Sequence, residues 1–375
     1  MAENQPVTGS ENRMTQTLQT FSARLRDFIS RAAPGSGHAF NSLALELFGL
    51  QFDANVPYRL FCAARRLSPA TVEHWTRIPA LPAAAFKNHE VTCLAPAART
   101  RVFHSSGTTQ HRPARHFHSE ESLAIYEASL LTWFQARMLP AGGSGRALCL
   151  TPPPEHAPHS SLAYMFGAIQ SALLPRSVAF AGQLAADGAW EVDPVAAEQI
   201  LQAAVAAQTP LAVLGTAFSF VHWLDGLAER GDCHTLPAGS CVVETGGYKG
   251  RSRSLPQAEL HALITEQLGV PAAGIVCEYG MSELSSQAYD TAGAAHEPRA
   301  FHFPPWARAQ VISPETGAPV GEGETGLLRV LDLANVFSVA AIQTEDLAVR
   351  RGDGFELLGR AALAEPRGCS LLAIA

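Results

Sequence analysis

Charged residues are few in this sequence, and no long block of one sign occurs. They make up 16% of the 375 residues, and the formal net charge is −7, with a pI near 6.1. Proteins that attract nucleic acids or anionic membranes electrostatically carry clustered lysine and arginine. This composition therefore predicts no nucleic-acid partner.

Segments that direct a chain into or across a membrane are missing as well. The first residues, MAENQPVTGSENRMTQ, are polar and contain neither the basic stretch nor the apolar run of a signal peptide. The most apolar segment, residues 203–224, is interrupted by Pro210 and His222, so we expect no membrane span. The seven cysteines include no CxxC pair and are odd in number, which indicates a reducing compartment. These features predict a cytoplasmic protein.

Apolar sequence, by contrast, is plentiful and patterned. Hydrophobic residues make up 47% of the chain, enough for a large core, and the length predicts two domains or one large domain with a small appendage. In residues 1–100 apolar positions recur at helical spacing, so we expect a mostly helical N-terminal region. The clearest example is Leu18, Phe21, Leu25 and Phe28.

Between residues 101 and 308 short apolar runs alternate with helical patterns. The runs RALCL, LAVL, SCVVE and GIVCE have the length of buried strands. A helix is expected after Ser119, which is a suitable N-cap, and another over Ala217 to Arg230. A third is expected from Ser254 to a stop at Gly269. Such alternation is typical of a sheet covered by helices, so we assign residues 101–308 to an α/β core.

The pattern changes again towards the end of the sequence. From residue 309 short strands and glycine-rich turns follow, as in GAPVGEGETGLLRVLDL, and we expect a small β subdomain over residues 309–357. Residues 358–375 are assigned to a C-terminal tail. The predicted fold class is therefore α/β, with a helical N-terminal region and a small β subdomain around the core.

The loops that follow the predicted strands carry polar chemistry. GTAFSF, ETGGYKGR and EYGMSEL follow three of the strands, and in open α/β sheets ligands bind where parallel strands end. A further loop, HSSGTTQHRP, offers four hydroxyl groups around a glycine, which suits a phosphate cradle, although it lacks the lysine of a GxxxxGK[ST] loop. We expect these loops to line one crevice. The residues of the cradle are Ser105, Ser106, Gly107, Thr108 and Thr109.

Each of these features also has an ordinary structural explanation. Tyr279 fits a core position at a strand end, Glu283 fits a solvated carboxylate, and Asp346 fits a turn. Histidines such as His116 and His118 have no cysteine or carboxylate at ligand spacing, so we expect no zinc site. The serine loop lacks the GxSxG context of a hydrolase nucleophile. The joint occurrence of the motifs decides between these explanations.

Four motifs, in this order, resemble those of the adenylate-forming superfamily, which includes acyl-CoA ligases, luciferase-like enzymes and peptide-synthetase adenylation domains. SSGTT resembles its phosphate loop, YGMSE its adenine and magnesium motif, TEDLA its ribose motif, and GR, residues 359 and 360, its hinge. More narrowly, AFKNHEV, FHSSGTT, ETGGYKGR and RGCSLL are similar to the acyl-protein synthetase (LuxE-like) family, which supplies fatty acyl groups to an acyl reductase. The resemblance implies an adenylate-forming large domain with a truncated C-terminal lid.

The resemblance also implies roles for individual residues. The serine and threonine loop would hold the β- and γ-phosphates of ATP, and Asp346 would bind the ribose. Tyr279 and Gly280 would face the adenine, Ser282 would contact the α-phosphate, and Glu283 would hold Mg2+. The remaining residues of the nucleotide site would be Gly246, Gly247 and Arg360.

Departures from the superfamily pattern concern the lid and its charge. Gln110 stands where glycine is usual, RPAR replaces a proline and lysine, and the sequence ends about 15 residues after Arg360. We expect no full lid domain with its catalytic lysine, and we expect Lys249 or Arg251 to supply the missing positive charge. Cys369 corresponds to the acyl-accepting cysteine near the C-terminus of acyl-protein synthetases. The alternative interpretation is that the last residues form a β-strand and that Cys369 is packed inside it.

The function implied by the resemblance is ATP-dependent activation of a carboxylic acid, in the first place a fatty acid, as an acyl-adenylate. The acyl group would pass to the thiol of Cys369 and on to an acceptor such as an acyl reductase, with ATP and Mg2+ as cofactors. Two alternatives stay open. One is an acyl-CoA ligase that delivers to coenzyme A, and the other is a non-catalytic nucleotide-binding subunit that scaffolds a reductase.

Overall fold

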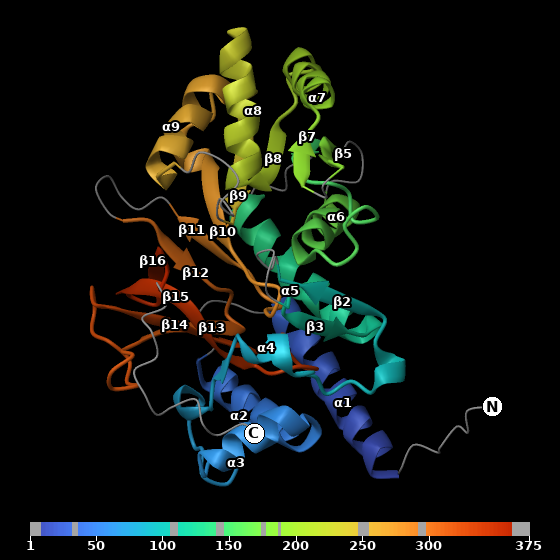
Figure 1. Ribbon diagram of the computed structural model, residues 1–375, viewed down its shortest axis with the longest axis vertical. Coiled ribbons are helices and arrows are strands. Elements are labelled where there is room, and N and C mark those ends of the chain that lie inside the picture. The colour runs from blue at the N-terminus through green and yellow to red at the C-terminus, as the bar shows by residue number, and fades with distance from the viewer. Residues whose placement is uncertain are drawn as a thin grey trace, which may run out of the picture.

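The protein is described by a computed structural model, which covers residues 9–31, 37–105, 112–139, 146–173, 178–186, 189–246, 255–291 and 298–361. A mixed sheet runs through the molecule, with helices packed on it and a group of N-terminal helices at one end (Figure 1). None of the helices in these ranges combines the length and the apolar character needed to cross a lipid bilayer.

The N-terminal helices pack against the C-terminal strands rather than apart from them. On the first helix Leu18, Phe21 and Leu25 are at most 2% exposed, and they belong to one hydrophobic cluster with residues of the antiparallel strands. Buried amides reinforce this contact, since Nε2 of Gln51 donates to the Asn335 carbonyl at 2.7 Å. The helices are α1 (Gly9–Arg31), α2 (Gly37–Ala54), α3 (Val56–Ala64) and the short α4 (Ala85–Asn88).

The central sheet has twelve strands in the described part of the chain, and its first half is parallel. Neighbouring strands follow the order β5, β4, β8, β9, β10, and the four predicted runs RALCL, LAVL, SCVVE and GIVCE are confirmed as β4, β8, β9 and β10. Parallel strands place their carboxyl ends at one edge, which is where the site is expected. Their bounds are β4 Arg146–Cys149, β5 Val178–Phe180, β8 Leu211–Thr216, β9 Cys241–Thr245 and β10 Ile275–Tyr279.

The second half of the sheet is antiparallel and continues from β10 in the order β11, β12, β16, β15, β14, β13, with β1 parallel to β15. The strands expected after residue 309 therefore lie in the same hydrogen-bonded sheet as the core strands. Their bounds are β1 Leu81–Pro82, β11 Ala288–Thr291, β12 Ala300–His302, β13 Ala307–Ile312, β14 Thr325–Asp332, β15 Ala341–Arg351 and β16 Gly354–Arg360.

Two hairpins stand outside the large sheet, and both contribute to the site. β2 (Arg101–His104) pairs with β3 (Arg115–His118), and β6 (Gly182–Leu184) pairs with β7 (Trp190–Val192). Short 3-10 helices complete the described elements: η1 Trp75–Arg77, η2 Pro96–Ala98 and η3 Ala272–Gly274.

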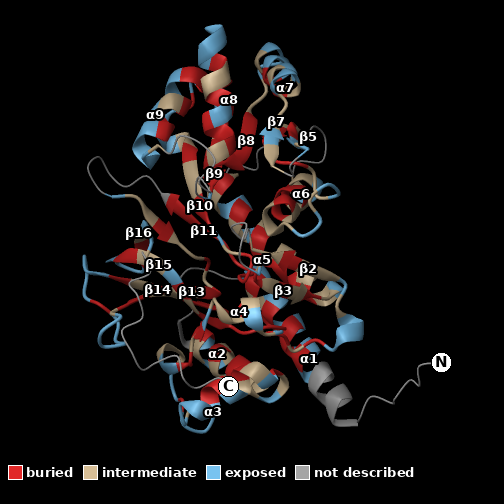
Figure 2. Cartoon of the chain, viewed as in Figure 1, coloured by how far each residue is buried: buried red, intermediate tan, exposed pale blue. Residues whose placement is uncertain are grey.

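Helices cover both faces of the parallel strands, as the alternation of side chains along β8 shows. Val213 packs with the layer of α7, α8 and α9, whereas Leu214 packs with α5 and α6. Buried residues accordingly concentrate along the strands and on the inward sides of the helices (Figure 2). The helix bounds are α5 Glu120–Met138, α6 Ser161–Leu173, α7 Pro194–Ala206, α8 Ala217–Arg230 and α9 Gln257–Leu268.

Most helix ends lie where the sequence signals predict them. Ser119 caps α5, since its Oγ accepts from the Ser122 N–H at 3.2 Å, and Gly269 ends α9 with φ of 66°. The predicted start of α9 is wrong, because the helix begins only at Gln257, after the extended Pro256. Ser254 itself lies outside the described residues.

Candidate active site

A cavity of about 600 Å³ opens where β8, β9 and β10 end. Thr216, Thr245 and Glu278 line it at these strand ends, and residues of α4, α5, α6, β15, β16 and the two hairpins complete its wall. The structure thus brings the predicted motifs together in one place. The motif residues on the wall are Ser105, Gly246, Gly280, Ser282, Glu283, Asp346 and Arg360.

Ser105 closes the base of the predicted phosphate loop. Its N–H donates to the Ala114 carbonyl at 3.1 Å, and its Oγ accepts from the Ala114 N–H at 2.9 Å. The β2–β3 hairpin, in which His104 pairs with Arg115, therefore holds the two ends of the loop together at the cavity. The other four predicted phosphate ligands lie outside the described residues: Ser106, Gly107, Thr108 and Thr109.

Gly246 turns the chain out of the sheet directly after β9. Its φ of 71° is a conformation that residues with a Cβ rarely adopt, and the residue lines the cavity. The backbone can thus approach a ligand closely at this strand end. Three further predicted residues of this loop lie outside the described part of the chain: Gly247, Lys249 and Arg251.

Glu283 presents a buried carboxylate to the cavity. Its side chain is 6% exposed, and Oε2 accepts from Oγ of Ser282 at 2.9 Å. Burial raises the pKa of Glu283, while the Ser282 hydrogen bond and the positive charges of Arg360 and Lys87 act in the opposite direction. A carboxylate with a hydroxyl donor and two cations nearby is suited to a site for phosphate groups and a divalent cation.

Two buried polar residues that the sequence analysis did not single out fix the Glu283 loop. Oδ2 of Asp332 accepts from the N–H groups of Ser285 and Ser286, at 2.9 and 2.8 Å. Nδ2 of Asn335 donates to the Glu283 carbonyl at 2.8 Å. Because Asp332 and Asn335 are at most 2% exposed, these hydrogen bonds form in a low-dielectric interior and hold the loop rigidly.

Asp346 lies on the cavity wall between two partners. Its Oδ2 accepts from the hydroxyl of Tyr279 at 2.8 Å, and its Oδ1 lies 3.7 Å from Nε of Arg360 on the neighbouring strand. Burial raises the pKa of Asp346, and Tyr279 and Arg360 oppose that shift. Tyr279 does not line the cavity, since its ring packs against Phe301 and Phe355 behind Asp346. Its predicted contact with adenine stays a prediction.

Lys87, which belongs to the AFKNHEV motif, lines the cavity although the motif predicts no role for it. It lies on α4, lines the cavity, and is close enough to Glu283 to lower its pKa. The whole sequence has two lysines, Lys87 and Lys249, against 25 arginines. One of them is on the cavity wall, and the other follows Gly246 by three residues in the sequence.

Two stacked histidines lie on the same cavity wall as Ser105. The rings of His104 and His159 stack with their centroids 4.5 Å apart, and both residues line the cavity. Burial and the neighbouring His159 lower the pKa of His104. A neutral imidazole at this position is a hydrogen-bond partner for a ligand, rather than a fixed positive charge.

Glu278 is a further buried carboxylate on the cavity wall, and the four superfamily-like motifs in the sequence do not include it. It is 5% exposed, and its Oε2 accepts a hydrogen bond from Oγ1 of Thr245 on β9. Burial raises the pKa of Glu278 to about 7; the Thr245 hydrogen bond opposes this shift and the charge of Glu244 adds to it. In the sequence, only its position directly before the YGMSE motif indicates that Glu278 could lie in the site. The strand register is needed to show that its side chain is on the cavity face of the sheet.

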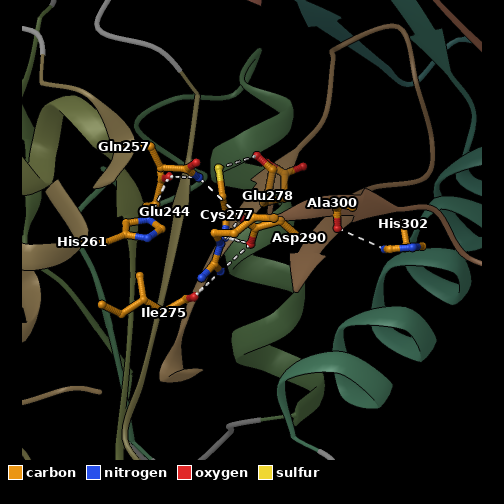
Figure 3. Close-up of polar contacts among 10 residues, drawn as sticks. Glu244, Gln257, His261, Ile275, Cys277, Glu278, Asp290, Ala300 and His302 are labelled. Carbon is orange, nitrogen blue, oxygen red and sulfur yellow. Dashed lines mark hydrogen bonds and ion pairs between the residues drawn. The ribbon is translucent and has the colours of Figure 1, made fainter. Parts of the chain in front are cut away.

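Glu244 is adjacent to Thr245 but belongs to the opposite face of the sheet. It pairs with Cys277, lies 3.5 Å from Nε2 of His261 on α9, and contacts Gln257, as Figure 3 shows. This cluster does not line the cavity. The two neighbouring carboxylates, Glu244 and Glu278, are therefore separated by the sheet.

Cys369, the predicted acyl acceptor, lies outside the described residues. None of the six cysteines in the described part of the chain lines the cavity. Burial raises the pKa of five of these thiols, so they are poor nucleophiles. The sixth, Cys233, is exposed, and its Sγ contacts the Glu266 carbonyl at 3.3 Å.

Sequence comparison identifies relatives of this chain. The profile of the LuxE acyl-protein synthetase family matches residues 194–374. A long-chain-fatty-acid–luciferin-component ligase from Aliivibrio fischeri is 26% identical over 141 residues, which span 35% of this chain and 36% of that protein. The chain therefore matches little more than a third of that curated relative.

Solved structures with a similar fold are adenylate-forming enzymes. A 2-hydroxyisobutyryl-CoA ligase in complex with 2-HIB-AMP and CoA has a TM-score of 0.63 at 16% identity, over 88% of this chain and 69% of that chain. The same ligase in an open conformation has a TM-score of 0.59 at 14% identity, over 96% of this chain and 80% of that chain. At such identities the likeness shows the fold. Residues 194–374 thus resemble the LuxE acyl-protein synthetase family, and the chain has the fold of adenylate-forming enzymes.

Proposed function

We propose that this protein uses ATP to activate a carboxylic acid as an acyl-adenylate and then passes the acyl group to a thiol. The observation that carries the proposal is the single cavity that gathers Ser105, Gly246, Glu283 and Asp346. These residues come from four separate elements, and each has the chemistry that one part of ATP requires. A shared cavity makes an accidental combination of surface residues a poor explanation.

The nucleotide would lie along the strand ends. Asp346, held by Tyr279 and Arg360, offers a carboxylate oriented for the ribose hydroxyls. Gly246, with open space at its Cβ position, leaves room for the phosphates close to the backbone. Ser105 anchors the loop whose remaining hydroxyls would surround the β- and γ-phosphates.

Glu283 would hold Mg2+ together with the phosphates. Among the described residues no group of three or more His, Cys, Asp and Glu side chains is arranged to hold a metal ion. The buried Glu283 carboxylate on the cavity wall fits Mg2+, which commonly binds one or two carboxylates and otherwise uses substrate phosphates and water. When bound, the cation would stabilise negative charge on the phosphates.

Lys87 would supply protein positive charge for the adenylation step. One oxygen of the carboxylate attacks the α-phosphorus, the bond to the bridging oxygen breaks, and pyrophosphate leaves with that electron pair. An ammonium group beside Glu283 is placed for the charge on the reacting phosphates or on the incoming carboxylate. Lys249 and Arg251 stay further candidates for the same task.

The second step requires a thiol from outside the described residues. A thiolate would attack the acyl carbon, the carbon–oxygen bond to phosphate would break, and AMP would leave. Because the described cysteines do not reach the cavity, Cys369 is the acceptor that we propose within the chain. The acyl group would then pass to an acceptor such as an acyl reductase, and coenzyme A is the alternative thiol. The Aliivibrio fischeri relative, a ligase for long-chain fatty acids by name, supports a fatty acid as the first acid to test.

ATP–pyrophosphate exchange with a panel of carboxylic acids tests the proposal. We expect Mg2+-dependent exchange with at least one acid, and loss of that exchange in Glu283→Gln. Exchange with none of the acids would favour a nucleotide-binding scaffold. The acceptor is tested by incubating Cys369→Ser with ATP and labelled acid. Adenylate should still form while hydroxylamine-labile labelling of the protein disappears, and persistent thioester labelling would assign the acceptor elsewhere.

A further inference from the structure

A row of polar side chains crosses the sheet on the cavity face. In the strand register Thr216 pairs with Thr245, Thr245 pairs with Glu278, and Glu278 pairs with Tyr289. Paired residues on neighbouring strands point to the same face, so the four side chains stand side by side across β8, β9, β10 and β11. Thr216, Thr245 and Glu278 line the cavity, and all four residues are at most 8% exposed.

Glu278 lies at the centre of this row, and the chain makes room for it. Its Oε2 accepts from Thr245. On its other side, a Cβ added to Gly280 would meet Oε1 of Glu278 at 2.3 Å, so the carboxylate fills the space that any larger residue would take. The absence of a side chain at Gly280 thus allows the Glu278 carboxylate to lie at the cavity wall.

Unused hydrogen-bonding atoms lie beside Glu278. Gln287, directly before β11 and two residues from Tyr289, is on the same face, lines the cavity and is 5% exposed. Its Oε1 is buried without a hydrogen-bond partner among the described residues, and so is the hydroxyl of Tyr289. A buried polar atom without a partner costs roughly 1 to 3 kcal/mol, and because Gln287 lines the cavity, its Oε1 indicates a ligand that satisfies it.

The polar row also limits what the acid can be. A purely hydrocarbon chain packed against this row would leave Oε1 of Gln287 unpaired and would exclude water from the Glu278 carboxylate, which accepts a hydrogen bond from Thr245. Apolar side chains from α6 and the β6–β7 hairpin, Leu162, Met165 and Leu184, line other parts of the wall and suit the hydrocarbon portion of a ligand. The cavity of about 600 Å³ would have to hold nucleotide and acid together, which places the acid against the row.

We propose that Glu278 and Gln287 recognise a hydrogen-bond-donating group, a hydroxyl or an amine, on the carboxylic acid that this enzyme activates. The inference rests on the proposed adenylating function and specifies its substrate class. The accepting oxygens of Glu278 and Gln287 match O–H and N–H donors, and the Glu278 carboxylate would favour an ammonium group further. Glu278 is thus a specificity residue for the acid. From the sequence alone, its position is that of a core residue at the end of a strand.

The test is pyrophosphate exchange with matched acids. At each chain length from four to sixteen carbons, the unsubstituted acid is compared with the hydroxy acid and the amino acid, substituted at the second carbon or at the chain end. We expect the best substituted acid to exceed its unsubstituted match in kcat/KM by at least about tenfold, because a polar site rejects an analogue that lacks the donor. A hydroxy acid and an amino acid that differ in rate distinguish the two donor classes.

Variants assign this preference to Glu278. Glu278→Met keeps the side-chain length and removes the polar atoms, so the ratio of kcat/KM for the substituted acid to that for the unsubstituted acid should fall to about one. Glu278→Gln keeps an acceptor oxygen, so this variant should retain the preference for hydroxy acids but lose the preference for amino acids. Gln287→Met should also lower the ratio. Glu198→Gln is the matched control, since it removes a partly buried carboxylate on α7, away from the cavity wall, and should leave the ratio unchanged.

Two results would overturn the inference while leaving the proposed function intact. One is equal or faster exchange with unsubstituted acids in the wild-type enzyme. The other is a uniform loss for every acid in Glu278→Gln and Glu278→Met, with folding verified by circular dichroism, which would assign the carboxylate to the reacting groups. Exchange with no acid at all would remove the proposed function and this inference with it.

Discussion

The hydroxyl of Tyr279 donates a hydrogen bond of 2.8 Å to Oδ2 of Asp346, and so joins the end of β10 to β15 behind the cavity wall. Tyr279 is 7% exposed, with its ring packed among phenylalanines. Arg360 approaches the other carboxylate oxygen from β16. Tyr279 therefore orients the Asp346 carboxylate, and the exposed Arg360 side chain adds a weak charge interaction.

Tyr279→Phe should weaken ATP binding without abolishing catalysis. The variant keeps the packed ring and removes the hydrogen bond to a carboxylate, which is worth roughly 1.5 to 3 kcal/mol, so we expect KM for ATP to rise about tenfold or more with a smaller change in kcat. Tyr58→Phe is the control, because it removes a buried hydroxyl that donates to the Pro79 carbonyl at 2.7 Å, away from the cavity. Equal KM values in wild type and Tyr279→Phe would show that Asp346 does not depend on Tyr279.

Glu283→Gln should abolish Mg2+-dependent activation while the fold persists. A neutral amide cannot replace the metal-binding charge, yet it can still accept the hydrogen bond from Ser282. The measurement is pyrophosphate exchange as a function of Mg2+ concentration. Glu322→Gln makes the same change of charge on an exposed turn and serves as the control. Near-normal exchange in Glu283→Gln would remove the magnesium role.

Lys87→Ala should slow adenylation roughly 10- to 100-fold, since it removes positive charge from beside Glu283 at the reacting phosphates. Lys87→Arg should recover part of the rate, because the charge returns with a different geometry. Arg77→Ala removes a positive charge from η1, outside the cavity wall, and controls for net charge. A normal exchange rate in Lys87→Ala would shift this role to Lys249 or Arg251, for which the same alanine substitutions apply.

Glu278 should make the stability of the protein depend on pH. Its pKa is raised from the ordinary 4.5 to about 7, so its contribution to stability is complete below pH 4.5 and is lost as pH rises through 7. The groups on its side of the sheet are Thr245 on β9, Tyr126 on α5 and Tyr289 on β11, and the charge of Glu244 acts on it from the opposite face. Urea unfolding of the wild type and Glu278→Gln checks this sign.

The free energy of unfolding of the wild type, relative to Glu278→Gln, should fall by up to about 3 kcal/mol between pH 5 and pH 8, since one pKa unit corresponds to about 1.4 kcal/mol. The variant has no group that titrates at this position. A difference that stays constant across this pH range would contradict the burial of an ionisable Glu278 at the cavity.

Local signals in the sequence predict much of this fold. Ser119 and Gly269 stand at helix ends because capping depends on neighbouring backbone groups alone, and the four apolar runs are recognisable as strands from their length and residue types. The start of α9 was misplaced because Pro256 fixes an extended backbone after the serine that matched the capping pattern.

The candidate site was predictable in its motifs but not in its supporting residues. Ser105, Glu283 and Asp346 stand in short patterns that the sequence displays directly. Lys87 and Glu278 reach the cavity through the packing of α4 and the register of β9, β10 and β11, which depend on contacts between residues far apart in the chain. Periodicity shows that a strand alternates, but only its neighbours decide which face meets a ligand.

The most direct test of the central claim follows an oxygen atom. The enzyme is incubated with ATP, Mg2+, a thiol acceptor and a carboxylic acid labelled with oxygen-18 in its carboxylate, and the products are measured by mass spectrometry. If the carboxylate attacks the α-phosphorus, one labelled oxygen stays with phosphorus when the thiol takes the acyl group, so we expect labelled AMP and unlabelled pyrophosphate. Label in inorganic phosphate with ADP as product, or no acid-dependent cleavage of ATP, would contradict adenylation by this protein.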